Sequence, residues 1–113
     1  MEQAGERRWS LEGARAVLAD VRARTERAVV QADGLIRERE QAGAEGRRAI
    51  DERIQGVVSR WAREIEALGA EAKGVWLVDF DNGSGYYCWR WPETALDHFH
   101  GYDDGFAGRT RIQ

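Results

Sequence analysis

The chain has 113 residues, so a single domain over residues 1–113 is expected. Its 20 acidic and 17 basic residues give a formal net charge of −3, without the basic excess typical of nucleic-acid-binding proteins, so we expect no nucleic acid partner. No apolar run approaches the roughly 18–20 residues that cross a bilayer, and the first residues lack the apolar centre of a signal peptide. A cytoplasmic protein without a membrane partner is expected, and the lone Cys88 fits a reducing compartment.

Residues 10–68 predict two helices joined by a turn. Ser10 is a good N-cap residue for the first helix. After it, apolar and small residues recur at alternating spacings of three and four, which is the heptad pattern of a coiled-coil seam. The seam consists of Leu11, Ala14, Leu18, Val21, Thr25, Ala28, Ala32 and Leu35. Gly43 and Gly46 interrupt this pattern in a polar stretch, so we expect the chain to turn there.

The second helix is predicted from about Gly46 to Leu68. Its broader apolar stripe consists of Ile50, Ile54, Val57, Val58, Trp61, Ile65 and Leu68. Two helices of this length joined by a short loop predict an antiparallel hairpin. Within a hairpin each stripe has only one partner helix, so we expect a second copy of the chain to complete a four-helix homodimer.

Residues 74–113 differ sharply, because most of the aromatic residues are concentrated there. The segments VWLVDF and YYCWRW are rich in strand-favouring residues and are separated by the turn sequence DNGSG, which predicts a β-hairpin. A third strand is predicted at residues 96–100, and residues 69–74 are predicted to be a joint between the two halves. The fold class is therefore α+β: a long antiparallel helical hairpin followed by a small antiparallel β-sheet and a pinned C-terminal tail.

The tail contains the segment GFAGR, which indicates a defined role close to the end of the chain. Gly105 and Gly108 would let the backbone fold tightly onto the sheet, with Phe106 in an apolar hollow. Asp79, a carboxylate in an apolar strand, needs a partner, and the Arg109 guanidinium can bind it in a two-pronged manner. The alternative interpretation is a pocket for an anion or a small molecule, lined by Asp79, His100 and Arg109.

A second candidate site is a divalent metal centre. His98 and His100 alternate on a predicted strand and would share one face, and Cys88, Asp79 and Asp103 could lie near them. Imidazole, thiolate and carboxylate are suitable zinc ligands, and the predicted metal ligands are Cys88, His98 and His100. The competing interpretation is that Cys88 and His100 are simply packed among aromatic side chains. No paired-cysteine spacing and no recognisable catalytic motif is present, so the sequence names no reaction.

Several motifs resemble one protein family. These motifs are WSLEGARAVL, GVWLVDF, YYCWRW and HFHGYDDGFAGR. They are similar to those of the bacterial domain of unknown function 2203 family, which implies a helical hairpin followed by an aromatic segment. Positions that match the family pattern are Asp79, Phe80, Cys88, Trp89, His100 and residues 105–109, whereas Phe99 replaces a more usual tryptophan and Asp81 a more usual proline. The resemblance implies no established activity.

Two functions follow from the sequence. The favoured one is a non-catalytic homodimeric interaction or scaffold module, because the chain combines long helices with an aromatic surface and shows no recognisable catalytic set; its protein partner is unknown. The alternative is a small-ligand or divalent-metal-binding protein with a site in the C-terminal β cap, the name we give to the aromatic, β-rich segment 74–113; enzymatic activity stays open for it. Apart from that metal ion, no cofactor is expected.

Overall fold

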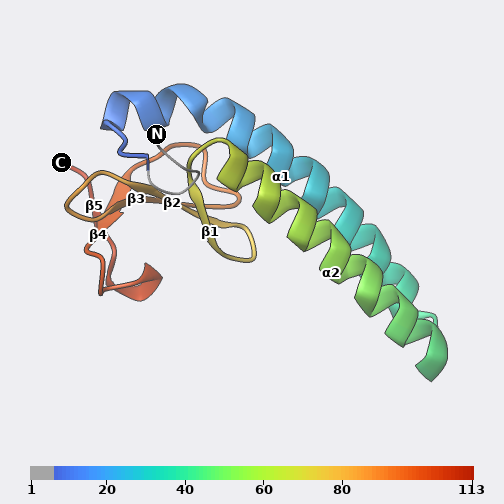
Figure 1. Ribbon diagram of the computed structural model, residues 1–113. Helices are drawn as coiled ribbons and strands as arrows, with labels where there is room; N and C mark the ends of the chain where they lie inside the picture. The colour runs from blue at the N-terminus through green and yellow to red at the C-terminus, as the bar shows by residue number, and fades with distance from the viewer. Residues whose placement is uncertain (1–6) are drawn as a thin grey trace.

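The structure, a computed structural model, describes residues 7–113 and consists of a helical hairpin followed by an antiparallel sheet (Figure 1). The hairpin is formed by α1 (Leu11–Glu40) and α2 (Ala44–Ala67). The sheet has the strand order β1-β2-β3-β4-β5, with β1 at Glu71–Gly74, β2 at Leu77–Asp81, β3 at Tyr86–Arg90, β4 at His98–His100 and β5 at Thr110–Arg111. A short 3-10 turn, η1 (Phe106–Gly108), precedes the last strand. The α+β class and the helical hairpin are confirmed.

Helix α1 follows the predicted heptad pattern closely. The Ser10 hydroxyl accepts a hydrogen bond from the Gly13 N–H at 2.9 Å and caps the first turn. Every predicted seam position is buried except Leu11, which is half-buried. Because small residues occupy much of this seam, α1 and α2 can approach closely, although each layer buries little apolar surface. No helix within residues 7–113 is long and apolar enough to span a bilayer.

Helix α2 buries a narrower stripe than its sequence predicts. Ile50, Trp61 and Ile65 are buried, whereas the other aliphatic residues of the predicted stripe are half-buried. The Trp61 indole N–H donates to the Thr25 hydroxyl at 2.8 Å, and that hydroxyl donates to the Val21 carbonyl at 2.7 Å. The threonine in the seam is therefore explained, because it supplies the acceptor that a buried indole N–H needs.

The predicted β2–β3 hairpin is confirmed, together with its turn. The Asn82 side chain accepts hydrogen bonds from the N–H groups of Ser84 and Gly85 at 2.8 and 3.0 Å, which is typical turn chemistry for asparagine. Gly83 adopts a φ of 94°, a conformation that glycine favours.

Strand β1 is a difference from the sequence prediction, which assigned residues 69–74 to a joint. Its sequence, EAKG, contains no strand-favouring residue, yet Glu71, Ala72 and Gly74 pair with β2, with a shift of register between Ala72 and Gly74. The pairing follows from a tight connection in which Trp76 takes a φ of 63° and its ring packs edge-on against Trp61 at 5.0 Å. Tertiary packing, not local preference, therefore makes this strand.

One face of the sheet shares a hydrophobic core with the hairpin. Val78, Phe80 and Trp89 are fully buried there and belong to the same cluster as the buried residues of α1 and α2. Trp9 joins this cluster, with its ring edge-on to Phe80 at 5.3 Å and its indole N–H bonded to the Gly69 carbonyl at 3.0 Å. The other face of the sheet carries the polar residues predicted to form a site, and we call it the outer face.

Candidate metal centre on the outer face of the sheet

The strand register gathers the candidate residues on one face. Asp79 of β2 lies opposite Cys88 of β3, which in turn lies opposite His98 of β4. Residues directly opposite each other in antiparallel strands point to the same side, so these three form a row across the outer face. His100 lies two residues beyond His98 and therefore points to the same side.

Three of these side chains converge. Each of Asp79, Cys88 and His100 offers one ligand atom, and the three atoms lie within 4.8 Å of one another. All three residues are buried, with exposed fractions of 2%, 0% and 5%. The structure therefore brings together a carboxylate, a thiol and an imidazole from three neighbouring strands.

Both ring nitrogens of His100 face oxygen atoms. Nδ1 lies 2.8 Å from the Gly101 carbonyl, which can only accept, so Nδ1 carries a proton and donates it. Nε2 lies 3.0 Å from Oδ2 of Asp79, and both atoms are buried. A backbone carbonyl that holds Nδ1–H and directs Nε2 toward the other ligands is the usual outer-shell arrangement of a metal-binding histidine.

The acidic groups of this cluster are shielded from water. Burial raises the pKa of the Asp79 carboxyl above its ordinary value, while the nearby His100 and Cys88 act in the opposite direction. Within the described residues, Oδ1 of Asp79 is buried and has no hydrogen-bond partner. Burial also raises the pKa of the Cys88 thiol to about 12, with the Asp79 charge adding to the effect and Arg109 opposing it. A thiol with this pKa is a poor nucleophile, so the arrangement does not favour cysteine-based catalysis.

Aromatic side chains flank the cluster. The ring of Tyr86 lies 5.3 Å from the His100 ring and packs edge-on against Tyr102 at 5.2 Å. The Lys73 ammonium lies 4.6 Å from the centre of the Tyr86 ring. These side chains place apolar surface beside the imidazole and help to keep water from it.

The predicted ion pair between Asp79 and Arg109 is wrong. Arg109 instead makes a two-pronged contact with Glu93, in which Nη1 lies 3.1 Å from Oε1 and Nη2 contacts Oε2. Asp79 on β2 already has His100 on β4 as its hydrogen-bond partner, whereas Glu93, in the connection between β3 and β4, offers two carboxylate oxygens to the guanidinium. The tail is therefore pinned as predicted, but to a different acid.

Glu93 is the residue that sequence reasoning missed. It follows Pro92 in the connection between β3 and β4, and its N–H bonds to the Arg90 carbonyl at 2.8 Å. Its own carbonyl accepts the Trp89 indole N–H at 2.9 Å, so the backbone is held at both ends. A glutamate that follows a proline is typical of an exposed turn, and no local sequence signal indicates that this residue pairs with Arg109.

The remaining predicted site residues do not join the three-residue cluster. His98 is half-buried, its Nδ1 is shielded and has no hydrogen-bond partner within residues 7–113, and it lies outside the group of converging ligand atoms. Asp103 is exposed. Arg109 lies close enough to Cys88 to influence its thiol but is bonded to Glu93. The suggested pocket of Asp79, His100 and Arg109 is thus divided between two separate pairs.

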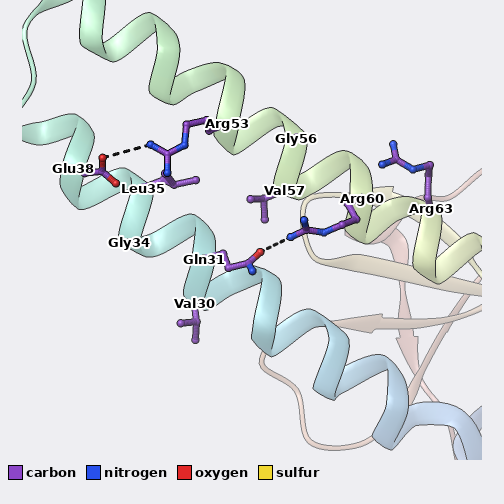
Figure 2. Close-up of a pocket in the computed structure, with 10 residues that line it drawn as sticks. All are labelled: Val30, Gln31, Gly34, Leu35, Glu38, Arg53, Gly56, Val57, Arg60 and Arg63. Carbon is purple, nitrogen blue, oxygen red and sulfur yellow. Dashed lines mark hydrogen bonds and ion pairs between the residues drawn. The ribbon is translucent and has the colours of Figure 1, made fainter.

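A groove elsewhere on the molecule is independent of this cluster (Figure 2). It has a volume of about 650 Å³, and all the residues that line it come from α1 and α2. Its opposite rims are bonded to each other, Gln31 to Arg60 at 2.6 Å and Glu38 to Arg53 at 3.5 Å. The groove therefore belongs to the hairpin and adds nothing to the site in the β cap.

A family model described as "Uncharacterized conserved protein (DUF2203)" matches residues 7–112. The chain belongs to the DUF2203 family. Since the match covers both the hairpin and the β cap, the family includes every element described above, and three of the matching positions named from the motifs form the converging cluster. The family description assigns no activity. No curated protein and no solved structure matches the chain.

Proposed function

We propose that this DUF2203 protein binds a divalent metal ion of the zinc type in its C-terminal β cap, with Asp79, Cys88 and His100 as ligands. The observation that carries this proposal is the convergence of the three ligand atoms within 4.8 Å of one another in a buried setting. Zinc is commonly held by such mixed sets of nitrogen, sulfur and oxygen ligands.

The charge balance of the cluster also favours a cation. A carboxylate and a thiolate together carry two negative charges, which a divalent ion neutralises, whereas burial without an ion raises the pKa of both groups and disfavours their charged forms. The Asp79 oxygen that lacks a hydrogen-bond partner has lone pairs available for a metal. Three protein ligands leave the fourth position of a tetrahedral zinc site open to water or to a small ligand.

Zinc binding by the purified full chain tests the proposal. After treatment with a chelator and removal of the chelator, the protein should take up about one zinc ion per chain, measured by titration calorimetry and elemental analysis. Asp79→Asn and His100→Gln should each weaken binding by at least about tenfold, because each removes a ligand. His98→Gln is the matched control on the same strand and face, and it should bind like the wild type.

A cobalt titration identifies the sulfur ligand. Co²⁺ bound to a cysteine thiolate gives a near-ultraviolet charge-transfer band, which should appear in the wild type and be absent in Cys88→Ser. The proposal fails if the folded wild type binds neither ion, or if Asp79→Asn and His100→Gln bind zinc as well as the wild type does. Far-ultraviolet circular dichroism of each variant shows whether the fold is retained.

We propose a second function, protein association, for the part of the hairpin that lies away from the sheet. In Figure 1 the two helices continue well beyond the sheet, so this part has no third layer. Large aliphatic residues are exposed there, with Val30 63% and Ile36 44% accessible. Apolar side chains exposed on helices that each have one partner are typical of an interaction surface, and the solution mass of the chain tests this function.

A further inference from the structure

The hairpin has two flanks of different character. One flank carries the groove. There, Gln31 bonds to Arg60 and Glu38 bonds to Arg53 across the two helices (Figure 2). We call this the polar flank. Because its rims are already bonded to each other, a partner would have to break these contacts to enter the groove.

The opposite flank of the hairpin contacts the β cap near the start of α1. Arg15, Arg22, Val29 and Ile36 follow one another at intervals of seven residues, so they lie along nearly the same line of α1. The two arginines bond to the β cap, Arg15 to the Leu96 carbonyl at 3.1 Å and Arg22 to the Glu93 carbonyl at 3.0 Å. Val29 and Ile36 continue this line beyond the cap, where Ile36 is 44% exposed. The flank that packs against the cap therefore continues as an uncovered surface.

Helix α2 contributes aliphatic residues to the same flank. In an antiparallel helix pair, the residues that directly follow the seam positions point to the same side of the pair on both helices. On α2, Val58 directly follows the stripe residue Val57, and Ile54 lies one helical turn before Val58. Both side chains are half-buried. We call the surface formed by Val29, Ile36, Ile54 and Val58 the aliphatic flank.

Charges of opposite sign border the aliphatic flank. On α1, Glu26, Asp33 and Glu40 form an acidic row at intervals of seven residues, and all three are exposed. Arg47, in the first turns of α2, is also exposed. Within residues 7–113, none of these four side chains takes part in an ion pair with another residue of the chain.

The register of the helices fixes where these features lie along the hairpin. Because Gln31 lies opposite Arg60, Val58 lies level with Asp33. Arg47 lies at the tip, beyond the end of α1 at Glu40. At a rise of about 1.5 Å per residue, Glu26 and Arg47 lie on opposite sides of Ile36 along the hairpin, at similar distances from it.

This arrangement is self-complementary. If a second copy lies antiparallel across the hairpin, with a twofold axis near Ile36, Glu26 of each chain approaches Arg47 of the second copy at both ends. The same axis brings Ile36, Ile54 and Val58 of the two chains together in the middle. We propose that the aliphatic flank is the docking surface for a second copy of this chain in an antiparallel dimer. This inference rests on the second proposed function and is independent of the metal site.

Sedimentation equilibrium of the full chain tests the dimer. The wild type should sediment as a dimer, and Ile36→Glu should raise the dimer dissociation constant at least about tenfold, because it buries charges at the centre of the interface. Val30→Glu is the matched control, since Val30 lies on the same helix, lines the groove of the polar flank and is more exposed than Ile36 (63% against 44%). It should leave the dissociation constant unchanged. Glutamate is a good helix former, so both variants should fold.

Charge reversal tests the antiparallel register. Glu26→Arg should weaken the dimer several-fold, and the double variant Glu26→Arg with Arg47→Glu should restore it, because the pair is then reversed. A wild type that stays monomeric at high concentration overturns both this inference and the second proposed function. A dimer that is broken by Val30→Glu and not by Ile36→Glu overturns the aliphatic flank as the docking surface, while association as such stands.

Discussion

The outer face of the sheet and the free part of the hairpin are both rich in charged residues, but they use them differently. On the sheet, Asp81 is buried and accepts hydrogen bonds from Arg8 at 2.9 Å and from the Tyr102 hydroxyl at 2.7 Å, which come from opposite ends of the described chain. On the hairpin, ion pairs such as Arg53–Glu38 are exposed and join adjacent turns of two helices. The cap depends on specific non-local contacts, whereas the hairpin depends on a repeated pattern.

Loss of a large core side chain should show this difference most strongly. Trp89 is fully buried at the junction of sheet and hairpin, and Trp89→Ala should lower the free energy of unfolding by about 3–5 kcal/mol. Ile50→Ala, a buried position near the tip of the hairpin, should cost about 2 kcal/mol, because few layers surround it and the site can relax. Urea unfolding followed by circular dichroism measures both values, and equal losses would contradict the comparison.

The hairpin contains one polar contact that behaves like those of the cap. Thr25→Val removes the hydroxyl that accepts the Trp61 indole N–H, so a buried donor loses its partner and the free energy of unfolding should fall by about 1–3 kcal/mol. Adding Trp61→Phe to Thr25→Val should cost less than Trp61→Phe costs alone, because no unpaired group is then left. Strictly additive losses in this double-mutant cycle would show that the contact is not coupled.

The sequence predicts the repeated part of the molecule better than the specific part. The seam of α1 and the β2–β3 hairpin depend on local signals, namely heptad spacing and turn residues, and both are confirmed. Strand β1 depends on packing around Trp76, and its own residues contain no strand signal.

The candidate site shows the same limit. The alternation of His98 and His100 places both on one face, but only the strand register decides that His100 is the one that meets Asp79 and Cys88. Which acidic residue pairs with Arg109 depends on the path of the connection between β3 and β4, and residue spacing in the sequence does not encode that path.

The contact between Glu93 and Arg109 should make the stability of the cap depend on pH. Burial acts to raise the pKa of Glu93, but hydrogen bonds from Arg109 and from the Arg90 N–H outweigh it, so the pKa lies below its ordinary value. A carboxylate with a lowered folded-state pKa contributes its full stability above the unfolded pKa of about 4.3 and loses it as the pH falls through the folded value.

Glu93→Gln should therefore lower the free energy of unfolding by about 1 kcal/mol at pH 7, and the difference from wild type should shrink as the pH falls below about 4. Unfolding titrations at several pH values measure this. Glu52→Gln, at an exposed position of α2, is the control and should follow the wild-type profile. A Glu93→Gln difference that stays constant down to pH 3 would show that the charge of Glu93 is not the cause.

Replacing a glycine by alanine should have opposite signs in the two regions, and the change in the hairpin should be the smallest effect of all. Gly34 lies inside α1, and a Cβ added there would meet no atom within 4 Å, so Gly34→Ala should stabilise the protein by about 0.5–1 kcal/mol through helix propensity and a less flexible unfolded chain. At Gly85, in the cap, an added Cβ would lie only 2.6 Å from the His100 carbonyl oxygen and 2.6 Å from the Phe99 ring, so Gly85→Ala should destabilise it. Thermal unfolding of the two variants measures both signs. A loss of stability in Gly34→Ala would contradict the open space around Gly34, and the contrast between a repeated hairpin and a specific cap would then not hold at this position.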